Sequence, residues 1–105
     1  SGFATDRFVF DGWLPRRAGR LQRQIESYLA QERTVVVLES CHRLLKSLPV
    51  LESCLGERRL AVCRELTKLH EEIRRGSAAE LRAHYEKHPP KGELVLVIEG
   101  AEGSA

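Results

Sequence analysis

Residues that could do chemistry gather in one run of the sequence, CRELTKLHEEIRRG at residues 63–76. Glutamate and histidine side chains can accept or donate a proton, and here they stand beside a threonine and several basic residues. Such a set could bind a ligand or take part in catalysis. It is equally typical of a solvated helix face, so the elements that position the run must decide between the two interpretations.

Two other patterns could do chemistry, and both are weak. His84 and His88 have the spacing of a two-histidine metal site on a helix, but no third ligand is evident. Cys41 and His42 are adjacent in the chain, and no residue is visible that would orient them as a nucleophile and its base. The sequence has no glycine-rich phosphate loop and no HExxH motif. We therefore expect no metal and no self-contained catalytic constellation.

The composition is that of one compact domain. The chain has 105 residues, of which 42% are hydrophobic, and a formal net charge of +2. This charge alone is too small to indicate nucleic-acid binding, although arginines cluster at residues 16–23. No apolar run approaches the ~20 residues that a membrane-spanning helix needs. Three cysteines without a CxxC pattern favour a reducing, cytoplasmic setting.

Apolar periodicity predicts alternating strands and helices. The expected strands are 8–10, 34–38, 60–63 and 94–98, and the expected helices are 18–31, 41–55 and 78–87. Ser77 and Glu80 form the pattern of a capping box, and Pro49 is expected to kink or split its helix. This alternation implies an α/β fold with a mostly parallel sheet covered by helices on both faces, a three-layer α/β/α domain.

Ligand-binding groups are expected where the strands end. In open α/β sheets, ligands bind at the carboxyl ends of parallel strands. Polar segments follow the second and third expected strands, at 39–43 and 64–68. The alternative is structural: Ser40 would cap the next helix, and Arg64 with Glu65 would form surface ion pairs of little energetic value.

The run at 63–76 fits two structures. Leu66, Leu69 and Ile73 have helical spacing, and the pattern alone favours a helix. A hairpin is also compatible with the sequence, since Leu69, Glu71 and Ile73 would alternate on one of its faces.

Five short motifs, in this order, resemble one protein family. They are TDRF at 5–8, GWLPR at 12–16, ESCHRL at 39–44, RELTKLHE at 64–71 and PKGE at 90–93. Together they resemble the bacterial ribosomal small-subunit RNA (cytidine-2′-O)-methyltransferases. These enzymes belong to the tetrapyrrole (corrin/porphyrin) methylase superfamily and use S-adenosylmethionine. The resemblance extends from residue 1 to about residue 100.

The resemblance implies a fold and a partial catalytic unit. Residues 1–101 would form a C-terminal subdomain with a five-stranded mixed sheet, whose last two strands run antiparallel to the first three. Residues 102–105 would be a tail or linker. The segment 70–75 would be a strand, and the final strand would insert at the centre of the sheet. An N-terminal subdomain would be missing, so we expect the chain alone to be inactive.

The resemblance also implies which residues meet the ligands. The adenosine of S-adenosylmethionine would contact the backbone of two segments, Leu38-Glu39-Ser40 and Glu65-Leu66-Thr67. The side chains expected to contact phosphates of the substrate RNA are Arg16, Arg17, Arg43 and Lys68. The catalytic base is unassigned, and the candidates are Glu65, His70 and Glu71.

Three functions are compatible with these observations. The first is 2′-O-methylation of a cytidine in 16S ribosomal RNA, with the small ribosomal subunit and the missing subdomain as partners and a homodimer as a candidate assembly. The second is methylation of a tetrapyrrole or another small molecule, which a wider apolar pocket would favour. The third is a non-catalytic nucleic-acid-binding module, suggested by the arginine cluster at 16–23.

Overall fold

The computed structural model describes residues 8–67 and 70–101, with the side chains of 8–64 and 71–101. The elements in chain order are β1 (Phe8–Trp13), α1 (Ala18–Ser27), β2 (Thr34–Ser40), α2 (Leu44–Leu55), β3 (Leu60–Thr67), β4 (His70–Gly76), α3 (Ala78–Lys87) and β5 (Glu93–Ile98). Every strand and helix expected from the sequence is present. The first three strands extend beyond their apolar cores into polar residues, whereas α1 ends at Ser27, before the expected boundary.

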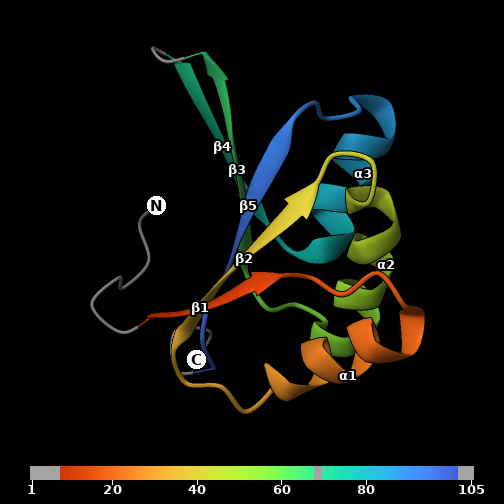
Figure 1. Cartoon of the computed structure of the whole chain (residues 1–105), viewed down its shortest axis with the longest axis vertical. Helices are drawn as coiled ribbons and strands as arrows, with labels where there is room; N and C mark the ends of the chain where they lie inside the picture. The colour runs from red at the N-terminus through yellow and green to blue at the C-terminus, as the bar shows by residue number, and fades with distance from the viewer. Residues whose placement is uncertain (1–7, 68–69, 102–105) are drawn as a thin grey trace.

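The strands form one five-stranded mixed sheet in the order β1-β2-β5-β3-β4 (Figure 1). β1 pairs parallel with β2, and β5 pairs antiparallel with both β2 and β3. β3 in turn pairs antiparallel with β4. The last two strands therefore run against the first three, and β5 inserts between β2 and β3, as the resemblance implied. A strand with neighbours on both edges is deeply buried, which explains the unbroken apolar sequence of β5.

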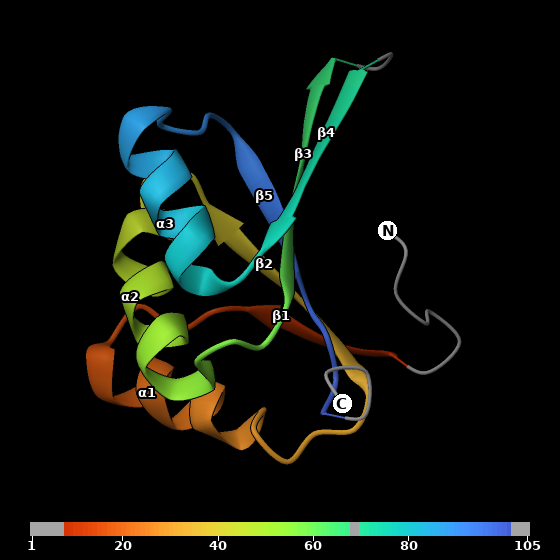
Figure 2. The same ribbon diagram turned by 180° about the vertical axis from the view of Figure 1, so that it is seen from behind.

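The three helices α1, α2 and α3 lie on one face of the sheet (Figures 1 and 2). The described part of the chain thus has two layers, where the sequence predicted three. Strand order explains the difference. Connections between parallel strands are right-handed, and the path from β1 to β2 to β3 never reverses direction across the sheet. Successive right-handed connections then place their helices on the same side.

A single hydrophobic core fills the space between the sheet and the helices. Strand residues and helix residues contribute about equally to it, and none of those named here is more than 2% exposed. They include Val35, Val37, Leu94, Leu96, Ile25, Leu48 and Leu81. Pro49 does not split α2, which continues unbroken from Leu44 to Leu55. The proline lies on the exposed side of this helix, where water can satisfy the backbone carbonyl that loses its amide partner.

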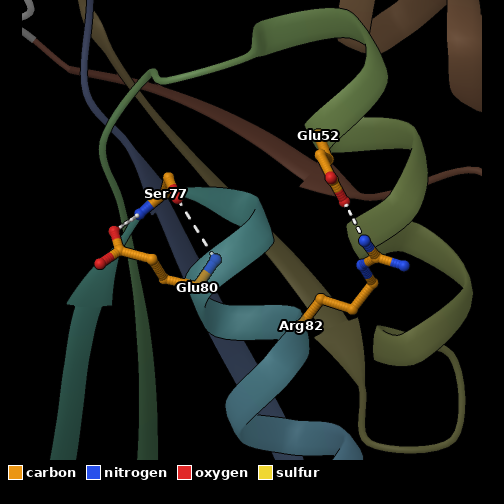
Figure 3. A network of polar contacts seen from close by, with 4 residues as sticks. All are labelled: Glu52, Ser77, Glu80 and Arg82. Carbon is orange, nitrogen blue, oxygen red and sulfur yellow. Dashed lines mark hydrogen bonds and ion pairs between the residues drawn. The ribbon is translucent and has the colours of Figure 1, made fainter.

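The start of α3 is fixed by the predicted capping box (Figure 3). The Ser77 hydroxyl accepts a hydrogen bond from the Glu80 N–H at 3.3 Å, and the Glu80 carboxylate accepts one from the Ser77 N–H at 2.9 Å. Nearby, the Arg82 guanidinium lies 2.8 Å from the Glu52 carboxylate, an ion pair that joins α3 to α2. These contacts fix both the boundary of α3 and its position beside α2.

The run at 63–76 belongs to an antiparallel hairpin formed by β3 and β4. Cys63 lies opposite Ile73, and Arg64 lies opposite Glu72. The helix favoured by residue spacing alone is therefore wrong, and the hairpin implied by the resemblance is confirmed. Beyond Arg64, β3 pairs only with β4. The two strands consequently project past the rest of the sheet (Figure 1).

Candidate functional site

A groove of about 530 Å³ opens on the face of the sheet that carries no described helix. Its floor is one row of directly paired residues, Leu38, Val95, Cys63 and Ile73, from four neighbouring strands. Directly opposite residues point to the same face, so the row forms a continuous apolar strip. Burial raises the pKa of the Cys63 thiol, which keeps this group neutral. The volume is typical of a site for a small molecule or cofactor.

Charged residues surround this floor. Glu71 of β4 and Glu93 of β5 line the groove, and Arg64 of β3 borders it although its row faces the helices, where its guanidinium pairs with Glu72. Glu71 and Leu38 were candidates from the sequence, whereas Glu93 and the other floor residues were not. Alternation within the strands indicated that such residues share a face. It could not indicate that β5 lies between β2 and β3 and brings the row together.

The polar segment at 39–43 begins at the end of β2, where several backbone groups already have hydrogen-bond partners. The Leu38 carbonyl accepts the N–H of Leu14 at 3.1 Å, and the Cys41 N–H donates to the Gly92 carbonyl at 3.1 Å. Glu39 is 3% exposed. Its carboxylate accepts the Ser40 N–H at 3.0 Å and the hydroxyl of Ser47 in α2. The Glu39 side chain thus holds β2 to α2, whereas the Leu38 side chain lines the groove.

The other polar segment, at 64–68, continues β3 beyond the groove. Glu65 pairs with Glu71 and Thr67 pairs with His70, and the register shifts between these pairs. The side chains of residues 65–67 and of His70 are not described, and Lys68 lies outside the described residues. Because β2 and β3 run in the same direction on either side of β5, the segments 38–40 and 65–67 both lie at carboxyl ends of strands that point the same way.

Three of the arginines and lysines predicted to contact RNA come close together. The Arg43 guanidinium donates a hydrogen bond to the Arg16 carbonyl at 2.7 Å. This contact joins the segment after β2 to the segment before α1, in which Arg17 is also exposed. The structure therefore concentrates positive charge beside the end of β2.

The rings of His84 in α3 and of His88, which follows this helix, lie near one another. Their ring centroids are 4.8 Å apart. Among residues 8–67 and 70–101, no group of three or more histidine, cysteine or acidic side chains is arranged to hold a metal ion. The pKa of His84 is lowered, chiefly because neighbouring groups displace water from the imidazole and also because Arg74 is positively charged. Within the same ranges, no helix is both long and apolar enough to cross a membrane.

Comparison with known proteins decides the family. Residues 1–82 match the Tetrapyrrole (Corrin/Porphyrin) Methylases. The chain belongs to this family. Among the family's relatives, it is 47% identical over 102 residues to ribosomal RNA small subunit methyltransferase I of Synechocystis sp., covering 96% of this chain and 37% of that protein. It is 45% identical over 98 residues to the protein of the same name from Erythrobacter litoralis, covering 93% and 35%.

The fold is shared with other tetrapyrrole methylases of known structure. One is a cobalamin biosynthetic enzyme, cobalt precorrin-4 methyltransferase, with a TM-score of 0.63 and 11% identity over 92% of this chain and 43% of that one. Another is the precorrin-6Y methylase of Archaeoglobus fulgidus, with a TM-score of 0.55, 17% identity and coverage of 91% and 39%. The chain spans 35% to 46% of the length of its relatives from Erythrobacter, Synechocystis and Thermotoga maritima.

Proposed function

We propose that this chain is the C-terminal part of an S-adenosylmethionine-dependent methyltransferase that modifies the 2′-hydroxyl of a cytidine in 16S ribosomal RNA. The observation that carries the proposal is the identity of 45% and 47% to proteins named ribosomal RNA small subunit methyltransferase I. The groove supports it, because its floor includes Leu38 near the carboxyl end of β2, and open α/β sheets bind their ligands towards the carboxyl ends of their parallel strands.

The groove suits S-adenosylmethionine in shape and charge. Leu38, Val95 and Ile73 offer an apolar floor to an adenine ring, and Glu93 offers a carboxylate to a cationic ligand. When bound, this cofactor supplies a methyl group carried on its sulfonium. Because several backbone groups between Leu38 and Cys41 already have partners, we place the contact of this segment at the Leu38 side chain and Ser40. The segment 65–67 would provide the second contact.

The reaction would need a group that accepts the proton of the attacking hydroxyl. A ribose 2′-hydroxyl is a poor nucleophile at neutral pH, so it must be deprotonated and aligned. Glu65, His70 and Glu71 remain the candidates. Of these, Glu71 is the one whose described side chain lines the groove, and we propose it as the base. RNA would approach over Arg16, Arg17, Arg43 and Lys68.

The uncovered face of the sheet would receive the rest of the catalytic unit. Phe10 and Trp13 are 59% and 52% exposed, and Ile73 is 40% exposed. An apolar strip of this kind marks an interaction surface. Since the relatives are more than twice as long as this chain, we propose that their remaining subdomain covers it. A homodimer is the second candidate occupant.

The test is methyl transfer by the longer protein that contains this chain. Small ribosomal subunits would be incubated with radiolabelled S-adenosylmethionine, and the modified nucleotide would be identified by mass spectrometry. The expected product is a 2′-O-methylcytidine, and the 105-residue chain alone should transfer no methyl group. Methylation of a base, or of a tetrapyrrole and not RNA, would contradict the proposal.

A further inference from the structure

A second pocket lies on the other side of the β3–β4 hairpin from the groove. Its volume is about 650 Å³, and it is bounded by the hairpin and the C-terminal half of α3. The residues that give it its chemistry are Arg64, Arg74, His84, Tyr85, Lys87 and His88. Arg64 and Arg74 belong to rows of the sheet that face the helices, as their pairing with Glu72 and Val62 shows. The proposed methyltransferase reaction does not use this pocket.

Positive charge dominates the pocket. Arg64, Arg74 and Lys87 are basic, whereas Glu72 is the single carboxylate among the described residues that line the pocket. Glu72 lies 3.3 Å from the Arg64 guanidinium and so neutralises that residue. No carboxylate of the described residues forms an ion pair with Arg74 or Lys87. A pocket with this balance of charge favours an anionic ligand.

One of the residues that line this pocket, Tyr85, has a buried hydroxyl without a partner in the described part of the chain. Tyr85 is 2% exposed, and its hydroxyl has no hydrogen-bond partner among the described residues. Buried polar groups are normally paired, because leaving one unsatisfied is costly. Burial also raises the pKa of the Tyr85 hydroxyl, so this group remains a donor. Within the described ranges, the Tyr85 hydroxyl is a donor without an acceptor, and Arg74 and Lys87 are cations without an ion-pair partner. An anion with several oxygens could accept hydrogen bonds from all three.

We propose that this pocket binds a phosphate group of the RNA backbone, with the Tyr85 hydroxyl and the Arg74 guanidinium as donors. The inference rests on the proposed function, since it takes RNA to be the substrate. The hairpin forms the outer edge of the sheet and projects beyond it (Figure 2). RNA that crosses this edge would place its target nucleotide in the groove and a neighbouring phosphate in the pocket. Contacts of this kind fix the register of a nucleic acid without reading its sequence.

The first test compares two charge reversals in the longer protein, Arg74→Glu and Arg33→Glu. Arg33 is exposed and precedes β2, which β5 and β3 separate from β4 and the pocket. Binding of a fluorescent single-stranded RNA would be measured between about 50 and 200 mM salt. Arg74→Glu should weaken binding about tenfold and reduce the salt slope by about one, whereas Arg33→Glu should stay within about twofold. Equal losses in the two variants would overturn the inference.

Tyr85→Phe tests the hydroxyl without a change of charge. Loss of a hydrogen bond to a charged group should weaken RNA binding by about tenfold. The thermal midpoint should be unchanged or higher, because the variant removes an unpaired buried hydroxyl. Wild-type RNA affinity in Tyr85→Phe would overturn the role given to this residue.

A titration with inorganic phosphate separates the pocket from the proposed reaction. The imidazole NMR signals of His84 and His88 should shift on addition of phosphate, relative to chloride at equal ionic strength, and Arg74→Glu should abolish the shift. If the signals shift in this way but RNA is not methylated, the pocket stands and the proposed function fails. If RNA is methylated but the signals do not move, the inference alone fails. If phosphate moves the signals and RNA does not compete, the assignment to RNA is overturned.

Discussion

Glu71 is the residue on which the proposed chemistry most directly depends. It is exposed, it lines the groove, and it lies in β4 opposite Glu65. A carboxylate in this position can accept a proton from a hydroxyl held above the apolar floor.

Replacement of Glu71 by glutamine removes this proton acceptor and keeps the shape of the side chain. We expect kcat of the longer protein to fall by about 10²-fold or more, with little change in KM for S-adenosylmethionine. Single-turnover methylation of small ribosomal subunits would measure the effect. Glu86→Gln, on the exposed side of α3, is the matched control. Similar rates in Glu71→Gln and the wild type would transfer the role to Glu65, His70 or the rest of the enzyme.

Arg58 joins segments that are distant in the sequence. Its guanidinium donates to the carbonyls of Tyr28 at 3.0 Å, Leu29 at 2.9 Å and Glu99 at 3.4 Å. Arg58→Ala should therefore lower the free energy of unfolding by about 2 kcal/mol, since charged donors make the stronger hydrogen bonds. Urea denaturation of the 105-residue chain would measure this change. The neighbouring exposed residue gives the control, and Arg59→Ala should change stability by no more than about 0.5 kcal/mol.

Replacing a glycine by alanine should have opposite effects on stability at Gly100 and at Gly19. A Cβ atom at Gly100 would lie 2.1 Å from the Glu32 carbonyl oxygen, which is backbone and cannot yield easily. Gly100→Ala should lower the free energy of unfolding by about 3 kcal/mol or more, because overpacking forces backbone shifts. At Gly19, in α1, a Cβ would meet only the end of Arg23 at 3.5 Å. Gly19→Ala should instead raise stability by up to ~1 kcal/mol. Thermal unfolding of both variants gives the comparison, and equal midpoints would contradict it.

At the scale of the elements, the capping box makes α3 sensitive to acid. Hydrogen bonds from Ser77 lower the pKa of the Glu80 carboxyl below its ordinary value of 4.5. A lowered pKa in the folded state stabilises the protein above the pKa of the unfolded chain, and the stabilisation is lost as the pH falls through the folded value. We expect Glu80→Gln to remove this component of the acid sensitivity. Urea midpoints at several pH values would test it. An identical pH profile in Glu80→Gln and the wild type would refute the role of the box.

Local sequence patterns predicted most elements and failed where long-range pairing decides. The segment 78–87 carries its own start signal, and its helix was predicted to the residue. Within 63–76, helical spacing was misleading because two of its three apolar positions, Leu69 and Ile73, also fit the alternation of a strand. Ile73 is 40% exposed and lies opposite Cys63, so it never joins the core that a helix would have needed. The family motifs resolved this ambiguity, and spacing could not.

The candidate site was predictable only in part, for a similar reason. Leu38 and Glu71 were candidates because they stand at a strand end or within a motif, and both line the groove. The backbone of Glu39 was expected to meet the cofactor, and this stays a prediction; what no local pattern indicated is that the Glu39 side chain is buried against α2. Glu93 and Val95 enter the groove because β5 lies between two earlier strands, which no local pattern reports.

At the scale of the whole molecule, one face of the sheet remains uncovered by any described helix. The isolated chain should therefore self-associate through this face. We expect Phe10→Ser to shift the association towards monomer, because it removes a side chain that is 59% exposed. Leu29 is 47% exposed but lies in the connection between α1 and β2 and not in a strand, so Leu29→Ser is the control. Sedimentation velocity over a range of concentrations would separate the two, and equal effects would argue against this surface.

The central position of β5 also determines when the sheet can be completed during translation. β5 is the last strand in the chain, yet it separates β2 from β3. While the ribosome is still translating, β1 with β2 and β3 with β4 are two unconnected ladders, each with an unpaired inner edge. Unpaired edges invite pairing with other chains. The nascent protein stays open to such pairing until residues 93–98 leave the exit tunnel and close the sheet.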